Sequence, residues 1–200
     1  MACTLAGATV LTLASCKGKE AERTDTAAMA PMAAPATDTA AAAAAAATPA
    51  KLTDANIAAV LDAANESDSA FGALAVKKGT SADVKSFGRL MMGEHHALRA
   101  EGRQLVKKLN VTPQAPANFD LPDKQRSAMT DISGKSGADF DKAYIDHEVA
   151  YHQQVLETAQ KALGDAQNAD LKNLIQRAAP VIQKHLDRAK EIQKKLGTTA

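Results

Sequence analysis

Aromatic residues are scarce in this 200-residue sequence, which has no tryptophan, two tyrosines and four phenylalanines. Runs of valine, isoleucine, threonine and tyrosine, which are typical of strands, are also missing. Alanine, leucine, lysine and glutamine dominate the second half instead, and these residues lose little side-chain freedom in a helix. The composition therefore predicts an all-α fold.

Charge of one sign is not in excess either, because 24 basic residues face 23 acidic ones, for a net charge of +1. Such a balance gives no reason to expect a nucleic-acid partner. The sequence also lacks a CxxC pair, a glycine-rich phosphate loop and a Gly-x-Ser-x-Gly elbow. These absences favour a protein that is not an enzyme.

Cysteine is equally rare, since the chain has only Cys3 and Cys16, both near its start. The apolar run around Cys3 is too short to span a bilayer but suits a signal peptide, which we predict over residues 1–15. The run ends in Leu13-Ala14-Ser15-Cys16, which resembles a bacterial lipobox, whose cysteine carries the lipid of the mature protein. No lysine or arginine precedes the run, and a cytosolic protein with an apolar start is the alternative.

Lipidation of Cys16 would anchor the chain to a membrane. Lys17, rather than an aspartate, follows Cys16. By resemblance to lipoprotein sorting in Gram-negative bacteria, this lysine indicates the outer membrane, with the protein facing the periplasm or the cell surface. Residues 16–51 are rich in alanine, threonine and proline, so they form a predicted disordered tether. A folded domain is expected over residues 52–197.

Beyond residue 52 the apolar residues recur with the helical period. The pattern predicts long helices over 54–78, 82–109, 139–163 and 169–196, and a short helix over 123–132. Thr53 and Ser81 are expected to cap helix starts, and helices are expected to end at Gly79, Gly164 and Gly197. The long link between the second and third long helices can cross the whole bundle. The prediction is a ferritin-like four-helix bundle with one crossover.

Ligand-type side chains interrupt the apolar stripe of each long helix when successive residues are placed 100° apart. They are Asp68 on the first helix, His95 on the second, Glu148 and His152 on the third, and His185 on the fourth. Glu94, Tyr144 and Met91 are expected to support them, with Glu94 at the margin of its stripe. His96 points away to solvent. Counted from the loops, the group meets near mid-bundle, with His185 offset by about 7 Å.

Three stretches of the chain resemble the bacterial "domain of unknown function 4142" family. They are FGRLMMGEH at 87–95, FDKAYIDHEVAYH at 140–152 and APVIQKHLDRA at 179–189. The shared pattern has an acidic residue before His95, Phe-Asp-x-x-Tyr before His152, and a proline before His185. The resemblance covers residues 53–197 and is loosest around Asp68. It implies a ferritin-like helical fold behind an export signal, and it implies no reaction.

Two interpretations of the histidine–carboxylate group stay open. Buried polar groups need partners, and either a closed hydrogen-bond network or a metal ion can supply them. The first makes the chain an envelope lipoprotein with a structural or stress-related role, which could bind a protein partner or a second copy. The second makes it a periplasm-facing protein that holds one transition-metal ion. Redox activity of the protein is part of this second interpretation.

The ligand set favours particular metals. A di-iron site needs Glu-x-x-His motifs, whereas Glu148 and His152 are four residues apart and inward carboxylates are few. Three histidines with one carboxylate suit zinc, iron or manganese. Met91 lies one turn before His95 and makes copper conceivable, although methionine also fills core gaps well.

Overall fold

The computed structural model describes residues 51–198, and in that range it contains five helices and no strand. The helices are α1 (Asp54–Lys78), α2 (Ala82–Lys108), α3 (Leu121–Ser133), α4 (Gly137–Asp165) and α5 (Ala169–Thr198). The all-α prediction is confirmed. None of the described helices is long and apolar enough to span a lipid bilayer. The predicted signal peptide, Cys16 and nearly all of the predicted tether lie outside the described residues.

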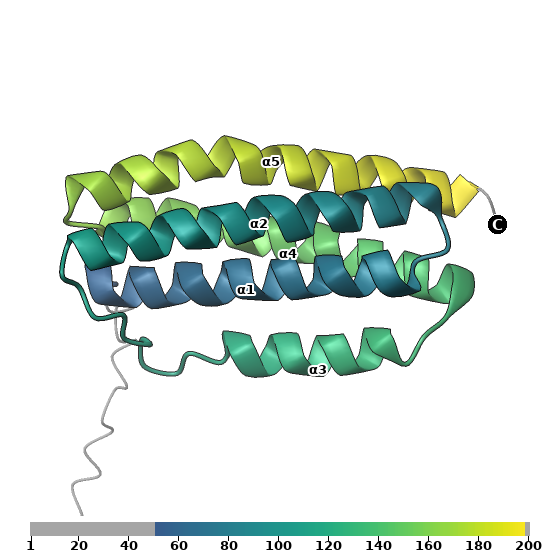
Figure 1. The fold of residues 1–200 in the computed structure, drawn as a ribbon, viewed down its shortest axis with the longest axis horizontal. Helices are drawn as coiled ribbons and strands as arrows, with labels where there is room; N and C mark the ends of the chain where they lie inside the picture. Colours follow the sequence, from purple (N-terminus) through teal and green to yellow (C-terminus); the bar gives the residue numbers. More distant parts are fainter. Residues whose placement is uncertain (1–50, 199–200) are drawn as a thin grey trace, which may run out of the picture. The chain divides into compact units, whose positions relative to one another are not determined.

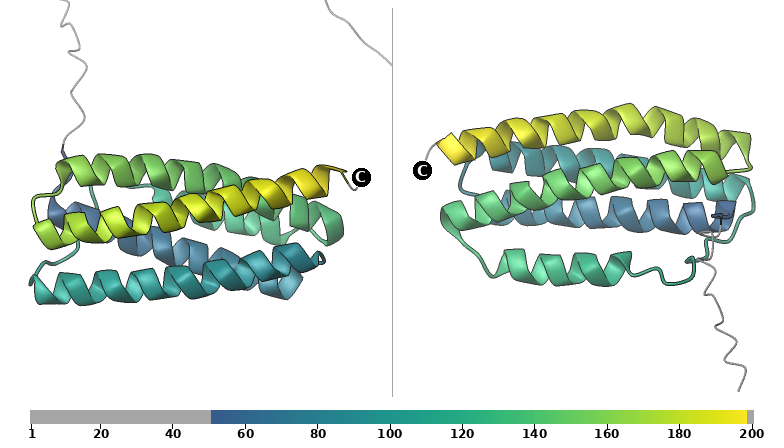
Figure 2. Two further views of the ribbon diagram at one scale, coloured as in Figure 1. Left: turned by 90° about the horizontal axis from the view of Figure 1, so that it is seen from above. Right: turned by 180° about the vertical axis from the view of Figure 1, so that it is seen from behind.

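The four long helices lie side by side, and each contacts two others (Figures 1 and 2). α1 packs on α2 and α4 packs on α5, each pair joined by a short loop, while α2–α5 and α1–α4 contacts close the ring. α3 lies outside this ring against α1 and α4. Figure 1 shows that the chain returns along α3, so α2 and α4 run in the same direction. The four long helices therefore present their apolar stripes to a shared interior.

Two of the predicted helix ends are wrong. α4 continues through Gly164 to Asp165, and α5 continues through Gly197 to Thr198. A glycine most often ends a helix by adopting a positive φ. Among the described glycines only Gly137 does so, with a φ of 59°. Gly164 and Gly197 therefore keep the helical backbone.

The two starts of the first hairpin are held in different ways. The Thr53 hydroxyl accepts the Asn56 amide at 3.1 Å and the Asn56 side chain accepts the Thr53 amide at 3.1 Å, so the predicted cap is confirmed. Ser81 occupies the cap position of α2, but its side chain makes no capping bond. The Asp141 carboxylate instead accepts the backbone amides of Thr80 at 2.9 Å and Ser81 at 2.7 Å. A residue of α4 thus fixes the start of α2.

Two apolar clusters lie between the four long helices, one toward each end of these helices. The aromatic end comprises Phe71, Ala75, Val84, Phe87, Met91, Ile132, Phe140, Tyr144, Ile145, Ala189 and Ile192. The alanine end comprises Ile57, Ala159, Ala162, Ala166, Leu171, Leu174 and Ile175. At the aromatic end α1 and α2 approach so closely that a Cβ on Gly72 would lie 2.5 Å from the Gly88 carbonyl oxygen. Between the two ends, each long helix carries a buried polar residue.

Candidate metal centre

Five of the buried polar residues form one layer across the four long helices. The layer comprises Asp68 of α1, His95 of α2, Glu148 and His152 of α4, and His185 of α5, each at most 2% exposed. Each helix continues its apolar stripe on both sides of the layer, so burial of the stripe carries the polar side chain inward. All five residues predicted from the sequence as ligands are therefore brought to one level of the fold.

The predicted 7 Å offset of His185 is wrong, because its Nδ1 atom lies 3.2 Å from Nε2 of His95. Part of the error comes from the end of α4, which lies beyond Gly164 and places His152 farther from the loop. The rest comes from side-chain direction, since Cα–Cβ bonds tilt toward the start of a helix. His152 therefore leans away from the loop that joins α4 to α5, whereas His185 leans toward it.

The three histidine rings surround a common point. Their centroids lie 5.6 Å apart for His95 and His152, 5.1 Å for His95 and His185, and 5.5 Å for His152 and His185. One ring nitrogen of each lies within 4.8 Å of one from each of the others. Three nitrogens on three different helices thus converge, and all three rings are buried.

The hydrogen-bond partners of these rings determine which nitrogens carry protons. The Asn65 amide nitrogen donates to the Leu61 carbonyl at 2.7 Å, so the Asn65 oxygen must accept from Nδ1–H of His95, at 2.9 Å. Nε2 of His95 is then left with a lone pair, because burial beside the other two histidines lowers the pKa of His95 to about 2. The neutral ring therefore points an unprotonated nitrogen into the cluster.

The other two rings are oriented by acceptors as well. Nε2–H of His185 donates to the Glu94 carboxylate at 2.7 Å, and Nδ1–H of His152 donates to the backbone carbonyl of Glu148 at 2.9 Å. Burial lowers the pKa of His185, and it lowers the pKa of His152 to about 4. Nδ1 of His185 and Nε2 of His152 are therefore the free nitrogens. Nε2 of His152 has no hydrogen-bond partner within residues 51–198.

Two buried carboxyl groups lie beside the histidines. Asp68 approaches Nδ1 of His95 at 3.5 Å, and Glu148 approaches Nδ1 of His152 at 3.4 Å. Neither carboxyl group has a hydrogen-bond partner of ordinary geometry among the described residues, although the Tyr144 phenol lies near Glu148. Burial raises the pKa of Asp68 well above its usual range, and burial together with the neighbouring Asp68 does the same for Glu148. Burial thus disfavours the charged form of both carboxyl groups, and a cation beside them would favour it.

The supporting residues differ in their relation to the layer. Glu94 lies at the margin as predicted, 45% exposed while bonded to His185. Tyr144 is fully buried, and burial with the nearby Glu148 raises the pKa of its phenol. Met91 belongs to the apolar core of the aromatic end. His96 is exposed, as the helical spacing predicts.

Sequence reasoning missed two polar residues of this region. Asn65 was not predicted although it orients His95, and its position one turn before Asp68 is the signal that could have found it. Tyr151 is buried with an unpartnered hydroxyl group, and burial together with Asp68 raises its pKa. His147 remains outside the layer and stacks on Phe71 at 4.2 Å between ring centroids.

Comparison with known proteins gives one result. The model of the family described as Domain of unknown function (DUF4142) matches residues 37–192. No curated protein and no solved structure shows significant similarity to the chain.

Proposed function

We propose that this chain, which belongs to the DUF4142 family, binds one divalent transition-metal ion through His95, His152 and His185. The observation that carries the proposal is the convergence of three unprotonated nitrogens. Nε2 of His95 and Nδ1 of His185 face each other at 3.2 Å with their protons on the far sides of the rings. Two lone pairs at that distance repel unless a cation lies between them, and Nε2 of His152 supplies the third donor.

The surroundings of the rings support the same proposal. Metal-bound histidines typically donate their other N–H to a carbonyl or carboxylate, which fixes the ring and raises its basicity. The Asn65 amide oxygen, the Glu94 carboxylate and the Glu148 backbone carbonyl occupy those positions here. Three neutral imidazoles suit Zn²⁺ or Fe²⁺, and a three-ligand site leaves a coordination position open. Met91 is packed in the apolar core of the aromatic end, so its thioether is not among the proposed ligands.

Asp68 and Glu148 complete the charge balance of the proposed site. A divalent ion among three neutral histidines is balanced by two carboxylates, and these two are the buried acids next to the rings. In the metal-free protein burial raises the pKa of both carboxyl groups. Binding of the ion therefore releases protons, which makes metal affinity rise with pH. A bound ion in an open site would act as a Lewis acid or activate a water molecule.

A metal-free network is the second candidate, and one observation favours it. Glu94, His185, His95 and Asn65 form a continuous chain of short contacts. A single extra proton on His185 would let it donate both to Glu94 and to His95, so the chain could close without metal. In that case the layer fixes the register of the helices, and the protein is a structural or stress-related envelope lipoprotein.

The type of helical fold and the membrane anchor are also part of the proposal. The closed ring of four helices with α2 and α4 parallel supports a ferritin-like four-helix bundle with one crossover. The Leu13-Ala14-Ser15-Cys16 sequence supports a lipoprotein tethered through Cys16, and Lys17 after it supports the outer membrane. Replacing Cys16 with serine should then move the protein from the membrane fraction to the soluble one. A wild-type protein that is already soluble would contradict the anchor.

Metal content and thermal stability separate the two candidates. Full-length protein freed of affinity-tag histidines should carry about one metal ion per chain by elemental analysis. Zn²⁺ at a hundredfold excess over its Kd should stabilise the fold by about 2.7 kcal/mol. His152→Ala and His185→Ala should abolish both effects, while His96→Ala, an exposed neighbour in α2, should leave them intact. Absence of metal together with a melting temperature that Zn²⁺ and Fe²⁺ do not change would favour the metal-free network.

A further inference from the structure

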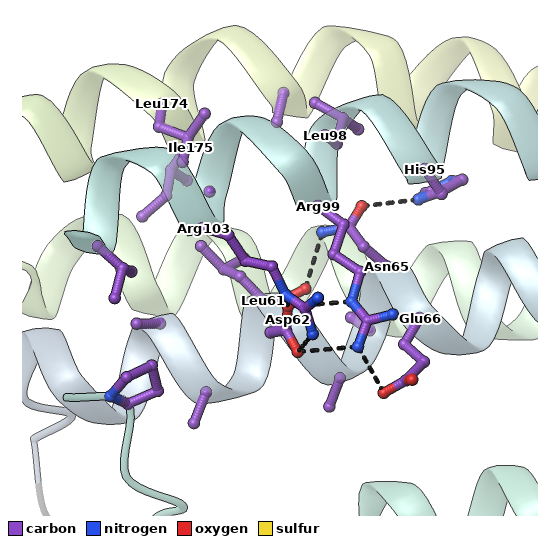
Figure 3. Close-up of a pocket in the computed structure, with 18 of the residues that line it drawn as sticks. Leu61, Asp62, Asn65, Glu66, His95, Leu98, Arg99, Arg103, Leu174 and Ile175 are labelled. Atoms are coloured by element: carbon purple, nitrogen blue, oxygen red, sulfur yellow. Dashed lines mark hydrogen bonds and ion pairs between the residues drawn. The ribbon is translucent and has the colours of Figure 1, made fainter. Parts of the chain in front are cut away.

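A cavity of about 440 Å³ lies inside the alanine end and reaches the polar layer (Figure 3). α1, α2, α4 and α5 all contribute to its wall, and His95 and Asp68 line it at the end nearest the layer. Most of the wall is aliphatic, and it includes Leu61, Leu98, Val106, Leu174, Ile175 and Ile182. No aromatic ring other than His95 lines it, so the cavity offers a smooth aliphatic surface rather than a stacking site.

Small residues create this space. Ala58, Ala64, Gly102, Ala159 and Ala178 line the cavity at positions where larger side chains would fill it. A Cβ on Gly102 would meet only Leu174 Cδ2, at 4.0 Å, whereas a Cβ on Gly72 in the aromatic end would clash with backbone atoms. An empty apolar cavity costs stability. A cavity of this volume lies in the usual size range of small-molecule sites, roughly 300–1,000 Å³.

Charged side chains surround the mouth of the cavity. Arg99 bonds Asp62 at 3.0 and 3.1 Å and pairs with Glu66 at 2.8 Å, while Arg103 bonds the same Asp62 at 2.6 and 3.1 Å. Figure 3 shows both guanidinium groups turned toward this one carboxylate. Lys107 also lines the cavity and is exposed. Three cations thus face two anions, which leaves one positive charge for a ligand to neutralise.

We propose that the cavity binds a linear aliphatic monocarboxylate, with its chain inside the alanine end and its carboxylate at Arg103 and Lys107. The aliphatic wall matches an unbranched hydrocarbon chain, and the surplus positive charge at the mouth matches one anionic head group. His95 and Asp68 are buried at the inner end, so the tip of the chain would displace no solvated charge there. The proposal does not depend on a metal ion, because the cavity and its mouth exist without one.

Calorimetric titration with dodecanoate below its micelle concentration tests this pocket. The titrated protein is the full chain with Cys16→Ser, which removes the predicted acylation and the need for detergent. We expect saturable binding of one dodecanoate per chain, and at least tenfold weaker binding of dodecyltrimethylammonium, which has the same chain and the opposite charge. Equal affinity for the two amphiphiles would overturn the assignment of the head group, and no binding of dodecanoate would overturn the pocket.

Matched variants locate the binding. Gly102→Leu fills the cavity and should weaken dodecanoate binding at least tenfold, while Gly93→Leu, in the same helix with nothing within 4 Å, should not change it. Lys107→Glu should weaken dodecanoate binding and strengthen binding of the cationic probe, whereas Lys135→Glu, between α3 and α4, should do neither. Equal affinities in Gly102→Leu and Gly93→Leu would refute the cavity as the site. A co-purified phospholipid that dodecanoate does not displace would also refute the proposal.

Discussion

The aromatic end and the alanine end use the same four helices but pack them in opposite ways. At the aromatic end, Gly72 and Gly88 let α1 and α2 touch through their backbones, and large rings such as Phe140 fill the interior. At the alanine end, small side chains leave a cavity of about 440 Å³. The polar layer lies between them. One end is thus built for stability, and the other retains space that only a ligand or solvent can occupy.

The largest expected effect on stability comes from removing an aromatic side chain at the aromatic end. Phe140 is fully buried, so Phe140→Ala should lower the free energy of unfolding by about 3–5 kcal/mol. Ile175→Ala at the alanine end should cost about 2 kcal/mol, the low end for such truncations, because Ile175 already borders a cavity and has fewer neighbours to lose. Urea unfolding of both variants without metal measures the difference. Equal losses would mean that the two ends are packed equally well.

Replacing a glycine with alanine should destabilise the protein at the aromatic end and stabilise it at the alanine end. A Cβ on Gly72 would lie 2.5 Å from the Gly88 oxygen and 2.7 Å from the Met92 amide nitrogen, and neither backbone atom can move away easily. Gly72→Ala should therefore destabilise the protein by about 1–3 kcal/mol. Gly102→Ala meets only a side chain at 4.0 Å and should gain up to about 1 kcal/mol from helix propensity. Thermal unfolding gives the melting temperature of each variant. A shift of both melting temperatures in the same direction would contradict this comparison.

In the metal-free protein the buried histidines and the buried carboxyl groups should have opposite effects on stability as the pH changes. His95, His147, His152 and His185 have lowered pKa values, so the unfolded chain binds more protons below pH 6.5 and stability falls on acidification. Asp68 and Glu148 have raised pKa values, so the folded chain keeps protons that the unfolded chain releases above about pH 4.5. These carboxyls therefore lower stability as the pH rises above about 4.5, whereas the histidines raise it up to about pH 6.5.

Replacing one carboxyl group measures its contribution to the dependence of stability on pH. Each retained proton changes stability by about 1.4 kcal/mol per pH unit. Asp68→Asn keeps the shape of the side chain and removes its proton, so the loss of stability that Asp68 causes above about pH 4 should disappear from the profile. Asp131→Asn, at an exposed position, should leave the profile unchanged. Chelator-treated protein and urea unfolding at each pH provide the measurement, and parallel profiles for wild type and Asp68→Asn would remove Asp68 from this role.

Helical periodicity was sufficient to predict the members of the polar layer but not their chemistry. The 3.6-residue spacing carries Asp68, His95 and His152 inward whatever their partners are, because the apolar stripe decides which face is buried. Which ring nitrogen is free depends on Asn65 and on a backbone carbonyl, and these contacts arise only when the helices pack. The tautomers therefore could not be predicted from the sequence.

The structural role of the small residues also could not be predicted from the sequence. Alanine and glycine fit both a tight helix contact and an empty space, so Gly72 and Gly102 look alike in the sequence although one fills a contact and the other borders the cavity. The end of α4 was misplaced for a related reason, since Gly164 can either end a helix or continue it. Long-range packing decides these cases, and local propensity does not.

The smallest predicted effect compares the helix starts at the two ends. Thr53 begins α1 at the alanine end with a local capping box, so Thr53→Ala should cost about 1 kcal/mol. Ser81 begins α2 at the aromatic end without a side-chain cap bond, and Ser81→Ala should be close to neutral, because the Asp141 carboxylate already accepts its backbone amide. Thermal unfolding should therefore rank the variants opposite to the order expected from N-cap propensity, in which serine ranks above threonine. A larger loss for Ser81→Ala would mean that the start of α2 depends on its own hydroxyl group, so that packing from α4 does not replace a local cap at the aromatic end.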